Sequence, residues 1–183
     1  MSAGKSPPKR PRRPRVTGLR KSALHLDVRG RARMVDVGGK TTTRRRAVAR
    51  GRVHMSLAAF EALASGGLSK GDALAVARLA GILAAKRASE IVPLAHAIAL
   101  DSVAVECDLD RRSREVVVTA TVSTVARTGV EMEALTAVAG ACLALYDMAK
   151  ALDRSITIRE VVLVEKTGGR SGPYRRSSAA GSE

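Results

Sequence analysis

The sequence predicts an α+β fold, a ferredoxin-like βαββαβ plait in which an antiparallel sheet carries its helices on one face. Three observations predict it. The expected elements follow in the order strand, helices, strand, strand, helix, strand. The two middle strands are β-branched and joined by a short polar turn, which is typical of a hairpin. The helical stretches are rich in Ala, Leu and Ile. This order is the split βαβ order of such a plait.

The first half of the chain combines extended and helical patterns. The expected elements are, in order, a short strand over 34–37 before a Gly38-Gly39 turn, an extended segment over 45–55, and helices over 56–64 and 71–90. Ser56 is a plausible N-cap for the first helix. The second helix ends before Pro93, because proline disfavours helical backbone in the residue that precedes it.

The second half supplies the hairpin, a long helix and a last strand. The expected elements are strands over 103–107 and 115–124, a helix over 131–152, a strand over 156–165 and a Gly-rich basic loop over 167–172. Small residues, among them Ala137, Gly140 and Ala141, lie along the long helix and permit close packing. The pattern leaves open whether they pack on the helix's own sheet or on another subunit.

Length and composition limit the class of protein. A chain of 183 residues suffices for one domain with a real core. No apolar run approaches the roughly 18–20 residues that span a bilayer, so we expect a cytoplasmic protein without a membrane segment. Cys107 and Cys142 stand singly in apolar patterns, which predicts small buried hydrophobic residues in a reducing compartment. The spacing of Cys and His indicates no metal site.

The net charge of +15 is concentrated at the N-terminus. Residues 1–20 contain seven Lys or Arg, four Pro and no acidic residue. Such a segment cannot bury enough apolar surface to fold. We therefore expect a disordered basic tail over 1–22, a single catalytic domain over 23–176 and a disordered C-terminus over 177–183. Any nucleic-acid contact is expected to be a weak one made by the tail.

The long helix carries acidic and basic residues suited to proton transfer. At about 100° per residue, Glu133 and Asp147 lie within roughly 40° of each other on its circumference. Lys150 is three residues beyond Asp147 and can pair with it, which lowers the pKa of the carboxyl. An ordinary surface ion pair explains the same spacing. Glu131 and Glu133 also suit the positive end of the helix dipole without any catalytic role.

Further candidates lie outside the long helix. Lys70 stands just before a helix N-terminus, where backbone N–H groups favour an anion. A solvated charge on the helix surface is the alternative for both lysines, but it suits Lys86 less well, because Lys86 follows Ala84-Ala85 in a nearly apolar stretch. His96 lies in a mostly apolar loop, where it is either a hydrogen-bonded core residue or a catalytic group placed by the scaffold. The glycines over 168–172 could wrap a phosphate with their N–H groups.

Several motifs match a known family in order. They are Met34-Val35-Asp36-Val37, Lys70-Gly71-Asp72, Ala77-Arg78-Leu79-Ala80-Gly81-Ile82, Ala84-Ala85-Lys86-Arg87, Ile91-Val92-Pro93-Leu94 with His96, Thr128-Gly129-Val130-Glu131-Met132-Glu133-Ala134-Leu135-Thr136-Ala137, Tyr146-Asp147-Met148 with Lys150, and Lys166-Thr167-Gly168-Gly169-Arg170-Ser171-Gly172. Over about residues 24–176 the chain resembles the cyclic pyranopterin monophosphate synthases of molybdenum cofactor biosynthesis.

The resemblance implies a fold, an assembly and a reaction. It implies a homo-oligomer, a hexamer built from dimers, with the active site at a subunit interface. The substrate it implies is (8S)-3′,8-cyclo-7,8-dihydroguanosine 5′-triphosphate, which a lyase converts to cyclic pyranopterin monophosphate with release of diphosphate. No tightly bound cofactor is implied, although Mg²⁺ can accompany the diphosphate.

The resemblance also implies roles for individual residues. Those that correspond to catalytic residues are Asp147, as acid/base, with Lys150, Lys70 and Lys86. Those that correspond to substrate-binding residues are Leu94, Ala95, His96, Glu131, Met132, Glu133, Arg45 and Lys166.

This chain departs from the family's pattern at three positions. The family usually has Cys and Pro where this chain has Ala95 and Ala97, and commonly has Cys where this chain has Ala149. Loss of the proline removes a rigid element beside His96. An alternative interpretation is therefore a divergent paralogue with weak or no activity that acts as a structural partner in an oligomer.

Overall fold

The structure, a computed structural model, describes residues 30–177. The chain divides into two compact units between Val35 and Asp36, and every helix and strand belongs to the second unit. These elements are β1 (Thr43–His54), α1 (Leu57–Ala64), α2 (Ala73–Lys86), α3 (Ala88–Ile91), β2 (Ser102–Asp110), β3 (Glu115–Ala126), α4 (Glu131–Ala149), β4 (Thr157–Thr167) and β5 (Tyr174–Arg175). The tail predicted over 1–22 lies outside the described residues, as does the C-terminal segment beyond residue 177.

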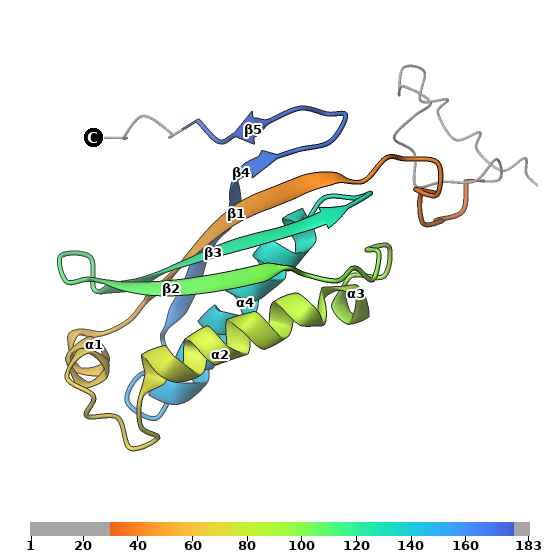
Figure 1. The fold of residues 1–183 in the computed structure, drawn as a ribbon. Coiled ribbons are helices and arrows are strands. Elements are labelled where there is room, and N and C mark those ends of the chain that lie inside the picture. The colour runs from red at the N-terminus through yellow and green to blue at the C-terminus, as the bar shows by residue number, and fades with distance from the viewer. Residues whose placement is uncertain (1–29, 178–183) are drawn as a thin grey trace, which may run out of the picture. The chain divides into compact units, whose positions relative to one another are not determined.

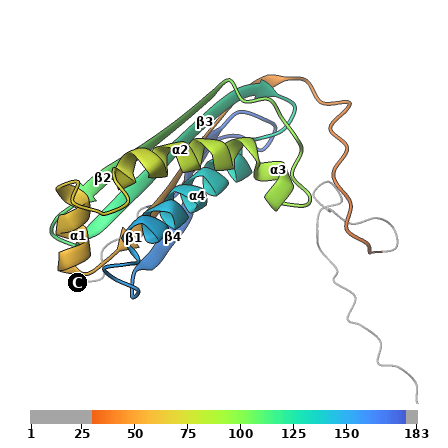
Figure 2. The same ribbon diagram turned by 90° about the horizontal axis from the view of Figure 1, so that it is seen from below.

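The strands form one antiparallel sheet in the order β2-β3-β1-β4-β5. The helices α2 and α4 lie side by side across one face of this sheet (Figures 1 and 2). The first four strands in this order reproduce the split βαβ arrangement, so the predicted ferredoxin-like plait is confirmed. The opposite face of the sheet has no helix over it among the described elements.

Small residues let α2 approach α4 closely. The buried residues of α2 recur at every fourth position, and they are Ala73, Ala77, Gly81 and Ala85. A Cβ atom added to Gly140 of α4 would lie 2.5 Å from the Cβ of Ala84, and one added to Gly81 would lie 2.9 Å from the Ala137 carbonyl oxygen. The small-residue side of α4 therefore packs within the same chain, on α2 and on the sheet.

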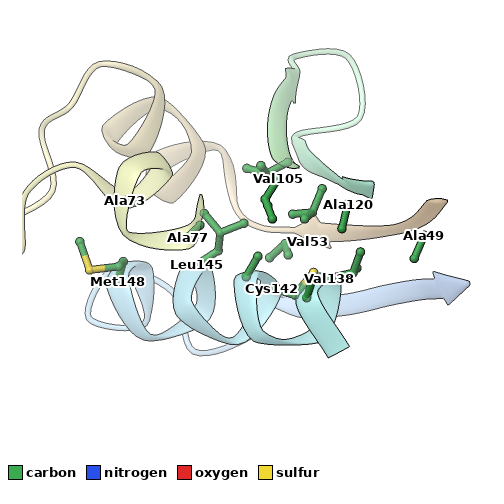
Figure 3. Packing of buried hydrophobic residues seen from close by; sticks show 14 of the residues in the cluster. Ala49, Val53, Ala73, Ala77, Val105, Ala120, Val138, Cys142, Leu145 and Met148 are labelled. Carbon is green, nitrogen blue, oxygen red and sulfur yellow. The ribbon is translucent and has the colours of Figure 1, made fainter. Parts of the chain in front are cut away.

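The core lies between the helix pair and the sheet. Figure 3 shows Val138 and Cys142 of α4 directed at the strands, with Leu145 and Met148 on the side of α2. Cys142 is fully buried and Cys107 is partly buried, and both are free thiols, as predicted. Burial raises the pKa of Cys142 to about 12 and that of Cys107 to about 11, so both stay protonated at neutral pH.

Three expectations about the elements were wrong. Residues 34–37 form no strand, because so short a run pairs with no neighbouring strand to satisfy its backbone groups. The helix expected over 71–90 is two helices, since Arg87 leaves helical geometry at φ −111° and ψ 14°. The strand β5 was not expected at all.

One helix among residues 30–177, α4, is long and apolar enough by length and composition to cross a membrane. Half of its window is buried inside the fold. It also carries the charged residues Glu133 and Asp147. The core helix of a folded domain has the same length and composition.

Candidate active site

A carboxylate held between two ammonium groups forms the centre of the candidate site, at the C-terminal end of α4. Asp147 Oδ2 lies 2.7 Å from Lys70 Nζ, and Asp147 Oδ1 lies 2.6 Å from Lys150 Nζ. Lys70 Nζ also donates to the backbone carbonyl of Asp147 at 2.9 Å. The three side chains are between 41% and 54% exposed, so a ligand can reach them from solvent.

The fold brings Lys70 to this cluster because α2 runs antiparallel to α4. The start of α2 therefore meets the end of α4. Gly71 has φ +91°, a conformation that glycine adopts without strain. The next residue, Asp72, caps α2 by accepting a hydrogen bond from Ala75 N at 2.9 Å. Lys70 thus leaves the cap directed at the last turn of α4, where carbonyl groups lack partners within the helix.

The electrostatics of the cluster fix its charge state. Hydrogen bonds from Lys150 and from Lys70 lower the pKa of Asp147 to about 2. The same hydrogen bond raises the pKa of Lys150. The predicted pairing of Asp147 with Lys150 is therefore present. A fall of the lysine pKa toward neutrality, which proton transfer by Lys150 would need, is not found in the single chain, because its nearest charge is an anion.

The cluster has the charge and the donors that could bind an anion. An ammonium group has three donors. Lys70 directs two hydrogen bonds at Asp147, and Lys150 directs one. Donors remain at both lysines for a phosphate oxygen, and the cluster of Lys70, Asp147 and Lys150 has one net positive charge at neutral pH. Asp147 holds the two ammonium groups close together despite their mutual repulsion.

A second group of predicted residues lies at the other end of α4. Glu133 is only 4% exposed, in contrast to Asp147. Its pKa is raised, first by burial and then by the negative charge of Glu131. The backbone N–H of Glu133 and the nearby His96 act in the opposite direction. Glu131, Glu133 and His96 therefore share one electrostatic environment, which the sequence motifs predicted.

The start of α4 explains part of this arrangement without any ligand. Val130 provides no side-chain cap, and Glu131 and Glu133 occupy the first turn. Acidic side chains there complement the helix dipole, so the simpler interpretation of these residues also holds. The Glu131 carboxylate folds over Gly129, where a Cβ atom would lie 1.8 Å from Oε2. A larger residue at position 129 would displace this carboxylate.

Arg45 and Lys166 lie on β1 and β4, at the strand ends near residues 126–127. Arg45 donates from Nε to the Ala126 carbonyl at 3.3 Å and from Nη2 to the Arg127 carbonyl at 3.2 Å. A Cβ atom at Gly169 would overlap the Arg45 guanidinium. Lys166 contacts the hydroxyl of Ser171 in the Gly-rich loop. The loop is therefore packed on Arg45, and its glycines serve this close approach.

The remaining predicted residues lie around the same end of α4. Lys86 is the exposed last residue of α2. Leu94 and Ala95 are partly buried in the turn that precedes His96, and Met132 is 37% exposed on α4. The described chain brings three of the four predicted catalytic residues together, Asp147, Lys150 and Lys70, and it places Lys86 with the other group.

The two groups are too far apart to act on one small molecule in a single copy. Fourteen residues separate Glu133 from Asp147, which corresponds to roughly 21 Å of helix rise. The predicted similarity of angle around the helix does not bring the two carboxylates together. We call Lys70, Asp147 and Lys150 the lysine cluster, and Glu131, Glu133 and His96 the glutamate cluster.

The sequence alone left two kinds of residue unidentified. It did not identify Ser171 as the partner of Lys166, since a contact across a loop has no periodic signal. It also missed the arginines on the open face of the sheet, Arg50 and Arg52, although their alternation in β1 was a readable signal.

An α+β plait with an exposed lysine–carboxylate cluster and remaining ammonium donors defines a class of protein, an enzyme scaffold for a small anionic substrate. The comparisons with known proteins identify the family. A family model described as "MoaC family" matches residues 34–169. The chain belongs to the MoaC family.

Named relatives are similar over nearly their whole length. A cyclic pyranopterin monophosphate synthase of Parvibaculum lavamentivorans is 54% identical over 155 residues, which cover 85% of this chain and 97% of the relative. The protein of that name from Roseiflexus castenholzii is 57% identical over 148 residues, covering 81% and 94%. Cyclic pyranopterin monophosphate synthase 3 of Mycobacterium tuberculosis is 52% identical over 155 residues, covering 85% and 87%.

Proposed function

We propose that the chain is a lyase of molybdenum cofactor biosynthesis. It converts (8S)-3′,8-cyclo-7,8-dihydroguanosine 5′-triphosphate to cyclic pyranopterin monophosphate and releases diphosphate. Membership in the MoaC family and the shared name of its relatives support this reaction. The observation in the chain itself that carries the proposal is the position of Asp147 between Lys70 and Lys150. A triphosphate substrate needs exposed cations, and this cluster offers them.

The chemistry assigns different work to the two clusters. To close the cyclic phosphate, an oxygen of the substrate loses its proton and bonds to the α-phosphorus, and the bond from that phosphorus to the bridging oxygen breaks. Diphosphate then leaves with the electron pair. Lys70 and Lys150 stabilise the charge on the diphosphate, and Asp147 keeps both ammonium groups in place. The proposal includes no tightly bound cofactor, and Mg²⁺ can accompany the diphosphate.

The glutamate cluster supplies proton transfer. Burial raises the pKa of Glu133, so this carboxyl retains its proton to a higher pH than an exposed one. The imidazole of His96 beside it can donate and accept a proton. Glu131, Met132, Leu94 and Ala95 line the same end of α4, while Arg45 and Lys166 provide positive charge there.

The site is composite and needs two copies of the chain. Large apolar side chains are exposed on the outer face of the helix layer, and they include Val76, Leu79, Leu83 and Leu143. Val76, Leu79 and Leu83 follow helical spacing and form one stripe on α2. If two copies pack through this layer about a twofold axis, the lysine cluster of one copy faces the glutamate cluster of the other. Three such dimers give the hexamer that the family resemblance implies.

A complementation experiment tests the composite site. Asp147→Asn and Glu133→Gln each disable one cluster, so each variant alone should have about a tenth of wild-type turnover or less. After the two variants are unfolded together and refolded as a mixture, about half of the dimers contain one of each, and each of those has one intact site. We expect about one quarter of wild-type turnover in the mixture. No recovery, in a mixture shown by mass spectrometry to contain mixed dimers, would place both clusters of a site in the same copy.

A structural partner without activity is the less favoured interpretation. Its support is the alanines at positions 95, 97 and 149. Against it, Lys70, Asp147 and Lys150 are all present and in contact. We further propose a cytoplasmic location, with nucleic-acid contact limited to a weak one by the tail over residues 1–22.

The direct test is an activity assay. Purified full-length protein is given the cyclic dihydroguanosine triphosphate, and diphosphate release is measured together with the pterin product. Turnover supports the proposal. A folded, oligomeric protein that releases no diphosphate from this substrate would refute the reaction and favour the structural partner.

A further inference from the structure

A basic groove of about 870 Å³ lies on the face of the sheet away from the helices. It is lined by Arg50, Arg52, Glu160, Val162, Val164, Arg175, Arg176 and Ser177. Gly51 of β1 faces the helix layer, because a Cβ atom there would contact Val138 and Cys142 of α4. Arg50 and Arg52 flank Gly51 in β1 and therefore point to the open face. The groove is distinct from the lysine cluster, which lies in the helix layer.

The strand β5 completes this groove. After β4, three glycines with positive φ, at positions 168, 169 and 172, turn the chain back along the sheet edge. The backbone of Arg175 then lies opposite that of Glu165 in the antiparallel register. The backbone N–H of Arg176 donates to the Val164 carbonyl at 2.7 Å. This return places two arginines beside Val162 and Val164, opposite Arg50 of β1. The short edge strand β5 therefore fixes the position of Arg175 and Arg176 beside β4.

The arginines of the groove are in two different states. Arg52 is fixed by carboxylates, with Nη1 at 3.0 Å from Glu115 Oε2 and Nε at 3.3 Å from Glu160 Oε2. Glu115 is 6% exposed, so this anchor is buried. Within residues 30–177, Arg50, Arg175 and Arg176 make no ion pair within 4.0 Å. Three guanidinium groups thus line the groove without an ion-pair partner among these residues, and Glu160, the acid in the lining, pairs with Arg52.

We propose that this groove binds an oligophosphate, either free diphosphate or the phosphate chain of a nucleotide. Guanidinium groups present paired N–H donors that match phosphate oxygens. The volume suits a small molecule, and Val162 and Val164 offer an apolar strip between the arginines. The proposal does not depend on the lyase reaction.

Calorimetric titration with sodium diphosphate at low ionic strength tests the groove. Lys70→Ala/Lys150→Ala removes anion binding at the lysine cluster, so binding that persists in this background belongs elsewhere. We expect it to persist and to weaken about tenfold or more when Arg50→Gln and Arg175→Gln are added. Arg111→Gln is the matched control, because Arg111 is exposed and pairs with Glu61, away from the groove. It should leave the affinity unchanged.

The same titration separates the two sources of the ligand. Adenosine triphosphate that binds more tightly than diphosphate identifies a nucleotide, and equal affinity identifies a free oligophosphate. Absence of diphosphate binding in the Lys70→Ala/Lys150→Ala background would overturn the proposal, as would binding unaffected by the arginine changes. Circular dichroism checks folding. If the combined variant unfolds, Arg175→Gln alone, on the edge strand, gives the same test with an expected loss of a few-fold.

Discussion

The two ends of α4 place the same chemical group in opposite environments. At the C-terminal end, Asp147 is exposed, accepts hydrogen bonds from two ammonium groups and has its pKa lowered to about 2. At the N-terminal end, Glu133 is buried and has its pKa raised. A pair of carboxyls whose pKa values are pushed apart is a recurring basis for dividing acid and anion roles in enzymes.

The difference teaches which carboxyl can carry a proton. Asp147 is ionised throughout the neutral range, so it serves as a fixed anion that positions Lys70 and Lys150. Glu133 is the carboxyl whose environment favours the protonated form. The resemblance to the family implies acid/base chemistry for Asp147, and that role stays a prediction; the positioning role is our own proposal, based on its contacts with Lys70 and Lys150. Proton transfer by Asp147 would require a partner copy or substrate to displace one of its lysines.

The largest expected effect is that of Asp147→Asn. The change removes the anion that holds Lys70 and Lys150 together, so the two ammonium groups repel each other and lose their positions. We expect turnover to fall by about 100- to 10,000-fold, measured as diphosphate release, with unchanged circular dichroism. Glu61→Gln is the control, because Glu61 is also an exposed carboxylate paired with a cation, Arg111, at 3.2 Å. More than a tenth of wild-type turnover in Asp147→Asn would contradict the role given to Asp147.

Glu133→Gln tests the other end of α4. The amide has nearly the same shape as the carboxyl but does not ionise, so it cannot transfer a proton. We expect turnover to fall by roughly tenfold to a hundredfold. The wild-type rate should decline as pH rises through the raised pKa of Glu133, and that decline should be absent from the variant. A pH–rate profile of the same shape in both proteins would remove Glu133 from the proton transfer.

The two carboxyls also predict opposite effects of pH on stability. The folded-state pKa of Glu133 lies above its ordinary value of 4.5, so its contribution is full below that pH and is lost as pH rises through the folded pKa. The folded-state pKa of Asp147 lies below its ordinary value of 3.8, so its contribution is present above that pH and is lost as pH falls toward 2. Urea unfolding of wild type and of each variant at several pH values measures these contributions, and the difference between wild type and variant should show opposite slopes for Glu133→Gln and Asp147→Asn.

Gly140→Ala tests the packing that keeps the two ends in register. A Cβ atom at position 140 meets Ala84 Cβ at 2.5 Å, so α2 and α4 must move apart. We expect the free energy of unfolding to fall by about 1–3 kcal/mol, measured by urea denaturation. Gly39→Ala is the matched control, since nothing lies within 4 Å of its added Cβ and its φ is not positive. Equal stability of the two variants would show that the helices separate without cost.

The smallest expected effect is that of Ala97→Pro, which restores the residue usual in the family. A proline beside His96 limits the conformations of the loop before folding. We expect turnover to rise roughly twofold, and Ala97→Ser, as the control, to leave it unchanged. A loss of turnover would show that this chain's loop has a conformation that proline cannot adopt.

Local patterns predicted much of the fold but not the depth of each side chain. The hairpin, the long helix and the spacing of Asp147 and Lys150 depend on residues near one another in sequence, and they were predicted within a few residues. The break at Arg87 has no glycine or proline to announce it. The strand β5 exists only because β4 offers it an edge, which no local pattern reveals.

The candidate site divides in the same way. Lys70 joins Asp147 through the antiparallel packing of α2 on α4, and the family motifs predicted both residues without predicting the contact. Helical periodicity gave Glu133 and Asp147 similar angles, but it is blind to the axial distance between them and to the burial of Glu133. The basic groove on the open face of the sheet is formed by β1, β4 and β5, which are neighbours only in the folded sheet.

The close antiparallel contact of α2 and α4 fixes the distance and the angle between the two clusters. One residue inserted into α4 between Glu133 and Asp147 would turn Asp147 by about 100° away from Lys70 and lengthen the helix by about 1.5 Å. Substitutions along this stretch are therefore tolerated where side chains fit, whereas insertions and deletions are not. The number of residues between the charged groups therefore determines their spacing.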